Sequence, residues 1–146
     1  MHLRSGGTDP GRDGCRVPLP WSARAPYAGF GSTTEPWLPQ PADWGSYAAD
    51  RQRTDPGSML SLYREALRLR RTEPGFRTAG AEGRQLTWLP SAPGVLAFAR
   101  TGGPVCVVNL GEGPVELPEH TDVLLLSGPL DGQGRLPRDT AAWLRP

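Results

Sequence analysis

The chain has 146 residues, 37% of them hydrophobic, and a net charge of +1, which suits one ordinary domain or a small domain with a tail. Its sixteen basic and fifteen acidic residues are intermixed, so no field is present that would attract nucleic acid or a membrane surface. No apolar run comes near the roughly 18 residues of a membrane-spanning helix, and the N-terminus lacks the pattern of a signal peptide. We therefore expect a cytoplasmic protein without nucleic-acid or membrane partners.

The sequence offers no pattern of metal ligands. Cys15 and Cys106 have neither the spacing of a metal site nor that of a disulfide framework, and two thiols suit a cytosolic protein. We expect no metal and no cofactor. Lysine and isoleucine are absent and Asn109 is the single asparagine, a bias typical of a GC-rich coding sequence.

Residues 1–57 show no sustained helical or strand period, and they are rich in proline. They also hold most of the aromatic residues of the chain, whereas disordered segments are poor in aromatic residues. The segment therefore predicts a long ordered loop. Loops of this length in compact proteins are usually functional or belong to something larger.

Two arginines flank an aspartate early in this loop, in Arg12-Asp13-x-x-Arg16, and a Pro-x-Pro-Trp segment ending at Trp21 follows. Proline excludes a helix from that segment. Taken alone, the three charged residues favour a salt-bridge cluster in a surface loop, which adds little stability, over a binding loop.

Residues 56–72 carry the clearest helical pattern. Asp55 is a good N-cap, Pro56 suits the first helical position, and Pro74-Gly75 follows the last turn. An apolar stripe runs along the helix and comprises Met59, Leu62, Tyr63, Ala66 and Leu67. Such a stripe must pack against something, and the preceding loop supplies no obvious partner.

From residue 83 onward, short β segments alternate with turns rich in glycine and proline. The expected strands are 85–89, 95–100, 105–110, 115–117, 123–127 and 141–144. Strands at roughly ten-residue spacing predict an antiparallel sandwich or sheet. The expected fold class is therefore mixed α+β, with an irregular loop region, one long helix and an antiparallel β-sandwich-like domain.

The Arg-Asp-x-x-Arg loop, the helix and the closing segment 136–144 together resemble one known family. They are similar to the end of the catalytic barrel and the C-terminal β domain of α-glucosidases in the α-amylase family (family 13 glycoside hydrolases), in the oligo-1,6-glucosidase-like branch. The resemblance covers nearly the whole chain. It implies that residues 1–75 are the C-terminal end of a (β/α)8 barrel, comprising late loops and the last helix, and that residues 83–146 are the C-terminal β domain.

The resemblance implies hydrolysis of α-glucosidic bonds in short oligosaccharides, with retention of configuration and without a cofactor. Retaining enzymes use two carboxyl groups, one as nucleophile and one as acid/base, and the family motifs that carry them have no match in this sequence. We therefore nominate no catalytic residue. By family the protein is a glycoside hydrolase, whereas the chain itself is expected to be the last part of the enzyme and inactive alone.

In similar α-glucosidases the second arginine of the motif pairs with an aspartate near the start of the barrel and holds the terminal hydroxyls of the non-reducing glucose. This role falls on Arg16, because a guanidinium can bond a carboxylate and a hydroxyl together. Trp21 or Trp37 is a candidate for contact with the sugar, and Arg12 and Asp13 are expected to brace the loop. After Arg16 the sequence reads Val-Pro-Leu-Pro-Trp where many relatives have Thr-Pro-Met-Gln-Trp, so the neighbouring subsite stays open.

Two other functions fit the same residues. One is a stand-alone β module that binds glucan through its aromatic side chains, which predicts glucan affinity without hydrolysis. The other is an accessory protein whose helix stripe docks on a partner, which predicts a defined oligomer with the stripe buried.

Overall fold

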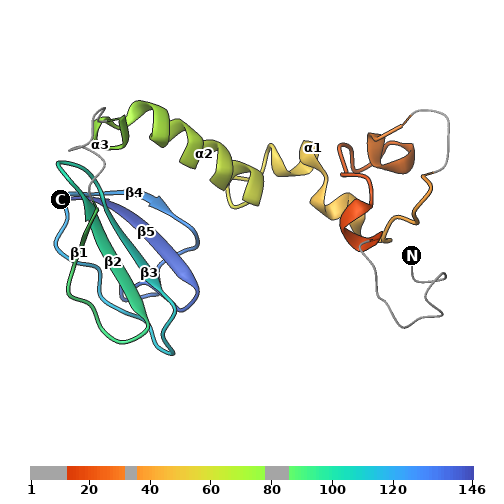
Figure 1. Cartoon of the computed structure of the whole chain (residues 1–146). Helices are drawn as coiled ribbons and strands as arrows, with labels where there is room; N and C mark the ends of the chain where they lie inside the picture. Colours follow the sequence, from red (N-terminus) through yellow and green to blue (C-terminus); the bar gives the residue numbers. More distant parts are fainter. Residues whose placement is uncertain (1–12, 32–35, 78–85) are drawn as a thin grey trace. The chain divides into compact units, whose positions relative to one another are not determined.

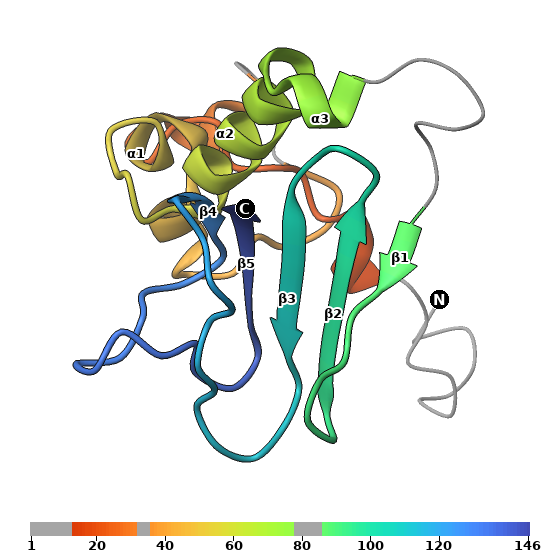
Figure 2. The same ribbon diagram turned by 90° about the vertical axis from the view of Figure 1, so that its left-hand side faces the viewer.

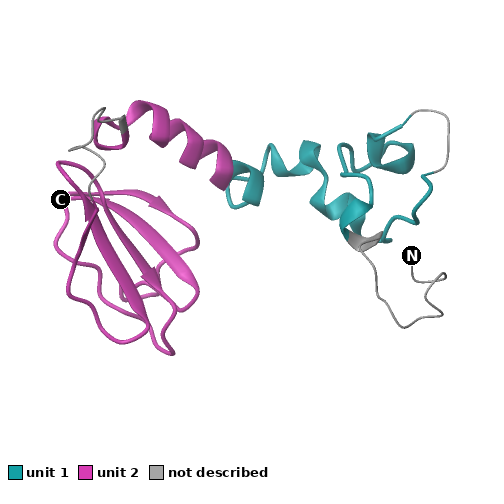
Figure 3. Cartoon of the chain, in the orientation of Figure 1, with its two compact units in different colours: residues 1–61 teal, residues 62–146 magenta. Residues whose placement is uncertain are grey.

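The computed structural model describes residues 13–31, 36–77 and 86–146 (Figure 1). The chain divides into two compact units, residues 1–61 and residues 62–146 (Figure 3). The boundary between the units falls inside the long helix, whereas the sequence analysis placed the whole helix in the first domain, residues 1–75. The expected domains 1–75 and 83–146 remain a prediction.

The first unit is built from short turns. It contains the 3-10 turns η1 (Asp13–Arg16), η2 (Pro26–Gly29) and η3 (Trp44–Tyr47), followed by the helix α1 (Ala49–Gln52). Backbone hydrogen bonds join its two ends: the Ala49 N–H donates to the Pro20 carbonyl at 3.0 Å and the Asp50 N–H to the Trp21 carbonyl at 3.1 Å. The loop is thus ordered by hydrogen bonding around the fully buried Ala48.

Asp50 fixes this arrangement with its side chain. Both carboxylate oxygens accept the Ala23 N–H at 3.1 Å, and one also accepts the Arg51 N–H at 2.8 Å. Desolvation by itself would raise the pKa of Asp50, but hydrogen bonds from Ser22, Ala23 and Arg51 outweigh it and hold this pKa below its ordinary value.

The long helix α2 (Met59–Thr72) begins three residues later than the sequence predicted. Asp55 does not cap it, because its Oδ1 accepts the Gly57 N–H at 2.9 Å and closes a turn instead. The Ser58 hydroxyl accepts the Ser61 N–H at 3.2 Å and is the actual N-cap. After Thr72 the chain turns at Glu73 and forms the short helix α3 (Pro74–Arg77).

The predicted stripe of α2 is only partly covered by the sheet. Leu62, Tyr63 and Ala66 line a cavity against the sheet, and Leu69, outside the predicted stripe, is the buried residue of the helix. Met59, Tyr63 and Leu67 remain largely exposed.

The second unit contains one antiparallel five-stranded sheet in the order β1-β2-β3-β5-β4 (Figure 2). The strands are β1 (Leu86–Trp88), β2 (Val95–Arg100), β3 (Val105–Asn109), β4 (Asp122–Leu126) and β5 (Thr140–Arg145). The expected strand at 115–117 is only an isolated bridge between Val115 and Leu136. The described residues therefore form a single sheet rather than two packed sheets.

One face of the sheet carries the core. Val107 pairs with Ala142, and both lie with the fully buried Leu136 and Leu144 in one cluster. The turns between strands cover this cluster with Val115, Leu117 and Leu130. The third and fifth strands therefore supply the centre of the core, as their apolar sequences indicate.

The other face carries aromatic rings. Phe98, Cys106 and Trp143 stand side by side in the register of β2, β3 and β5. The Trp143 ring contacts the edges of Phe98 and Phe76, with centroids 5.6 and 4.9 Å apart. Such edge contacts stabilise by about 0.5–1.5 kcal/mol each beyond area burial, so α3 is held on this face through Phe76.

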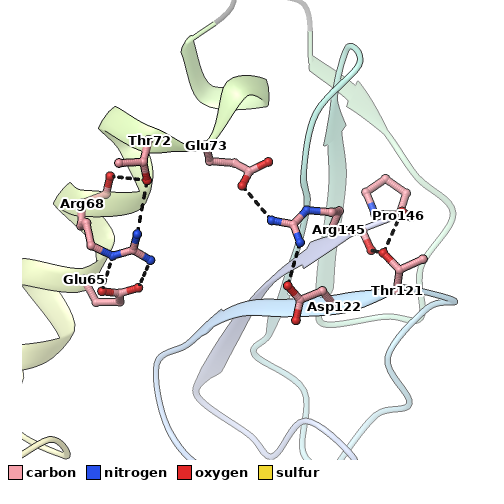
Figure 4. A network of polar contacts seen from close by, with 8 residues as sticks. All are labelled: Glu65, Arg68, Thr72, Glu73, Thr121, Asp122, Arg145 and Pro146. Atoms are coloured by element: carbon pink, nitrogen blue, oxygen red, sulfur yellow. Dashed lines mark hydrogen bonds and ion pairs between the residues drawn. The ribbon is translucent and has the colours of Figure 1, made fainter.

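Close backbone contact and an ion-pair network complete the attachment. A Cβ at Gly75 would lie 2.5 Å from the Gly103 Cα, so α3 can approach the turn between β2 and β3 only with glycine here. Arg145 bonds Glu73 at 2.9 Å and Asp122 at 2.7 Å (Figure 4). Glu73, directly after α2, is thus tied to β5 of the sheet.

Asn109, fully buried at the end of β3, closes the turn that follows. Its Nδ2 donates to the carbonyls of Gly113 at 2.9 Å and Leu136 at 3.0 Å, and its Oδ1 accepts the Gly111 N–H at 2.9 Å. These bonds satisfy three backbone groups, of which the Leu136 carbonyl is buried, and no apolar side chain would do so. The single asparagine of the chain is therefore structural, beyond any coding bias.

We predict that Leu144→Ala destabilises the sheet by about 3 kcal/mol, because a fully buried leucine leaves a cavity. Hydrogen exchange of the β3 amides measures the sheet separately from the first unit. Leu110→Ala is the matched control, since that side chain is 54% exposed, and it should change exchange little. Equal effects of the two substitutions would contradict the assignment of the core.

We also predict that the two thiols differ sharply in reactivity. Cys15 is exposed, whereas burial raises the pKa of the Cys106 thiol to about 11, so very little thiolate forms there at pH 8. A disulfide reagent should therefore label the native protein in a fast phase, which Cys15→Ser removes. Cys106 should react only as the sheet opens, and two equally fast phases would disprove its burial.

Candidate functional site

Arg16 ends η1 and lines an open cavity of about 410 Å³ within the first unit. The other lining residues that the structure describes are uncharged: Pro18, Tyr27, Phe30, Gly31, Pro36, Trp37 and Leu38. The cavity therefore combines one guanidinium with three aromatic rings. This combination suits a neutral polyol, because a sugar offers both hydroxyls and an apolar ring face.

A left-handed turn places two of these rings. Tyr27 and Ala28 have φ of 51° and 53°, and Gly29 follows at 73°. Only glycine adopts this region freely, so each of the first two costs on the order of 1–3 kcal/mol. Strain of this kind collects at ligand sites.

Hydrogen bonds hold the strained turn in place. The Ala28 carbonyl accepts the Trp21 N–H at 2.8 Å and the Ser22 N–H at 2.9 Å. The Tyr27 carbonyl accepts the Gln40 Nε2 at 3.2 Å. The turn is therefore a braced part of the loop, and its rings at 27 and 30 are set at the cavity by the backbone.

The predicted site residues do not all come together. Trp21 is 53% exposed and is not among the lining residues of the Arg16 cavity; its backbone holds the strained turn instead. Trp37 does line the cavity and is 93% exposed. Arg12 lies outside the described residues, and Asp13 opens η1, so their bracing role remains a prediction, as does sugar binding by Arg16 and Trp21.

Sequence reasoning missed Tyr27 and Phe30 as lining residues. The only local signal was Gly29, which favours a left-handed turn at its own position. Nothing in the sequence marks the preceding Tyr27 and Ala28 as left-handed, because the hydrogen bonds that enforce this come from residues 21, 22 and 40.

Neither a metal centre nor a membrane helix is found in the described part of the chain. Within residues 13–31, 36–77 and 86–146, no three His, Cys, Asp or Glu side chains gather closely enough to hold a metal ion. Over the same ranges, no helix has both the length and the apolar character needed to cross a bilayer.

Residues 2–79 match the model of the alpha-amylase catalytic domain. The chain is 33% identical over 129 residues to a probable alpha-glucosidase from Rhizobium meliloti, covering 85% of this chain and 21% of the relative. It is 38% identical over 72 residues to an oligo-1,6-glucosidase from Saccharomyces cerevisiae, covering 47% of this chain and 12% of that protein. The chain thus spans about a fifth or less of the length of each of these two relatives.

Solved structures share the fold. A trehalulose synthase from Pseudomonas mesoacidophila matches with a TM-score of 0.67 and 26% identity, covering 92% of this chain and 26% of its own. A trehalose-6-phosphate hydrolase from Bacillus licheniformis matches with a TM-score of 0.64 and 18% identity, covering 99% of this chain and 30% of its own. The family match spans more than half of the sequence, and the chain therefore belongs to the alpha-amylase family.

Proposed function

We propose that this chain is the C-terminal part of a retaining α-glucosidase that hydrolyses α-glucosidic bonds in short oligosaccharides. The observation that carries the proposal is the cavity in which Arg16 meets three aromatic rings, in the loop that matches the alpha-amylase catalytic domain. The relatives named alpha-glucosidase and oligo-1,6-glucosidase support the same class of substrate.

In this proposal Arg16 binds the terminal glucose of the substrate. Its guanidinium donates to sugar hydroxyls and to a carboxylate supplied by another part of the enzyme. Tyr27 and Trp37 offer ring faces to the apolar side of the sugar, and Trp21 contributes through the turn that its backbone holds.

The same proposal assigns residues 1–75 to the end of a (β/α)8 barrel and residues 83–146 to its C-terminal β domain. Support comes from the alpha-amylase match, which ends at residue 79, and from the single antiparallel sheet that follows. Helix α2 is then the last barrel helix. Its exposed row of Met59, Tyr63 and Leu67 is the surface that the rest of the barrel would cover.

We predict that the 146-residue chain does not hydrolyse p-nitrophenyl α-glucoside. Retention requires two carboxyl groups about 5–5.5 Å apart, one as nucleophile and one as acid/base, and the proposal places this pair in another part of the enzyme. Release of p-nitrophenol by the purified chain is the measurement. The proposal is wrong if the purified chain hydrolyses the substrate and if changing one of its Asp or Glu residues to the amide abolishes that activity.

In the complete enzyme, Arg16→Ala should lower kcat/KM for maltose by roughly ten- to a thousandfold, because a charge-assisted bond is lost and its carboxylate partner is left unpaired. Arg16→Lys should recover only part of the loss, since an ammonium lacks the planar fork. Steady-state kinetics on maltose provide the comparison.

Arg24→Ala is the matched control for that experiment. Arg24 is exposed in the same loop and does not line the Arg16 cavity. Its loss should leave kcat/KM within about twofold of the parent. If Arg16→Ala folds normally and behaves like Arg24→Ala, then Arg16 belongs to a surface cluster and the proposed sugar site is wrong.

A further inference from the structure

The left-handed backbone of Tyr27 sets this residue apart from the other aromatic residues that the structure describes. Over the described ranges, the non-glycine residues with positive φ are Tyr27, Ala28 and Asp139, at 51°, 53° and 57°. An aspartate tolerates this region, because its short side chain can bond the nearby backbone, whereas a bulky aromatic residue does not. Tyr27 therefore carries a conformational cost that its residue type does not explain.

Contacts from other segments keep the turn in this conformation. The Tyr27 carbonyl accepts the Gln40 Nε2 at 3.2 Å, and the next carbonyl, of Ala28, accepts two N–H groups from residues 21 and 22. That segment is held in turn by Asp50, which accepts the Ala23 N–H at 3.1 Å. The surroundings thus impose the turn, which is the condition under which backbone strain persists, and such strain collects where ligands bind.

Tyr27 is also the most enclosed of the three aromatic residues at the Arg16 cavity. It is 37% exposed, against 58% for Phe30 and 93% for Trp37, and all three line the cavity. A side chain that its surroundings hold in one orientation distinguishes ligand shapes better than a mobile one does. The strained residue is therefore the aromatic side chain best placed to select a ligand beside Arg16.

A second cavity, of about 590 Å³, brings together the same residue types without strain. It lies between α2, α3 and the aromatic face of the sheet, and its lining includes Arg100, Phe76 and Trp143. The Arg100 Nε is buried and its guanidinium carbon lies 6.0 Å from the centroid of the Phe76 ring, while Trp143 contacts the same ring. These groups pack against one another, and no described residue of this lining has a positive φ. Strain accompanies the aromatic residue of the Arg16 cavity specifically.

We propose that Tyr27 is a specificity-determining residue of the sugar site, and that its left-handed backbone is retained because it sets the ring toward the ligand. The inference rests on the proposed α-glucosidase function and deepens it: Arg16 recognises hydroxyl groups, and Tyr27 recognises the closed pyranose ring that carries them. A pyranose has a flat face of C–H groups, which suits the face of an aromatic ring. An acyclic polyol with similar hydroxyl groups lacks that face.

Glucose and sorbitol are the probes, used as inhibitors of maltose hydrolysis by the complete enzyme. Tyr27→Leu keeps the left-handed strain and an apolar side chain but removes the ring face. It should weaken inhibition by glucose by about two- to tenfold, the factor expected for one ring contact, and leave inhibition by sorbitol within about twofold. Tyr27→Phe keeps the ring and should preserve the preference for glucose. An unchanged glucose inhibition constant in Tyr27→Leu, or equal weakening of both probes, overturns the proposal.

Ala28→Gly is the matched control for strain. Residue 28 has the same left-handed backbone but does not line the cavity, and glycine adopts this region freely. Relief of strain at this position leaves the Tyr27 ring in place, so inhibition by glucose should stay within about twofold of the parent. A loss as large as that of Tyr27→Leu would show that the strain itself, rather than the ring, governs binding, and would overturn the proposal.

Hydrogen exchange in the 146-residue chain checks that the loop stays intact. The amides of Trp21 and Ser22 donate to the Ala28 carbonyl, so their exchange reports on the turn. Tyr27→Gly relieves the strain and removes the ring; these amides should exchange no faster than in the parent, while inhibition of the complete enzyme by glucose weakens as in Tyr27→Leu. Faster exchange would mean that the ring supports the fold, and the strain would then not be retained for a ligand.

Arg16→Ala in the same assay separates this inference from the proposed function. Loss of its contacts to hydroxyl groups should weaken inhibition by glucose and by sorbitol alike. If Arg16→Ala weakens inhibition and Tyr27→Leu does not, the sugar site stands and Tyr27 is not its specificity residue. If Arg16→Ala changes neither maltose hydrolysis nor either inhibition constant, the proposed sugar site is wrong, and the role of Tyr27 falls with it.

Discussion

The sheet of this protein depends on where its last strand is placed. β5 lies between β3 and β4, so residues near the end of the chain complete a sheet that begins at Leu86. From this one strand Ala142 and Leu144 enter the core, while Trp143 on the opposite face receives Phe76 from α3. Arg145 then ties Glu73, directly after α2, to the sheet. Both faces are therefore organised by the same six residues.

The first unit is held together in a different way. It buries few apolar side chains, and its shape comes from hydrogen bonds between segments about 27 residues apart, with Asp50 at their centre. Such a frame can hold the left-handed conformation of Tyr27 and Ala28, which a freely packed loop would relax. The Arg16 cavity therefore depends on backbone geometry more than on a hydrophobic core.

Each of the two cavities is lined by an arginine and by aromatic rings, but the two arginines differ in how far they are buried. Arg16 ends an exposed turn, and the other described residues of its cavity are uncharged, which suits hydroxyl groups. Arg100 has a buried Nε, and its guanidinium carbon lies 6.0 Å from the centroid of the Phe76 ring. Burial of the donor, rather than residue type, distinguishes the two arginines.

The sequence alone determined the family, the existence of the long helix and all five strands, because these depend on local residue order and spacing. The sequence did not predict that β5 pairs with β3. It also did not predict that Ser58 rather than Asp55 caps the helix, or that residues 115–117 form only one bridge. It also gave no signal for the left-handed Tyr27 or for the buried Nε of Arg100. These features are set by contacts between residues far apart in the chain, and only the tertiary structure brings those partners together.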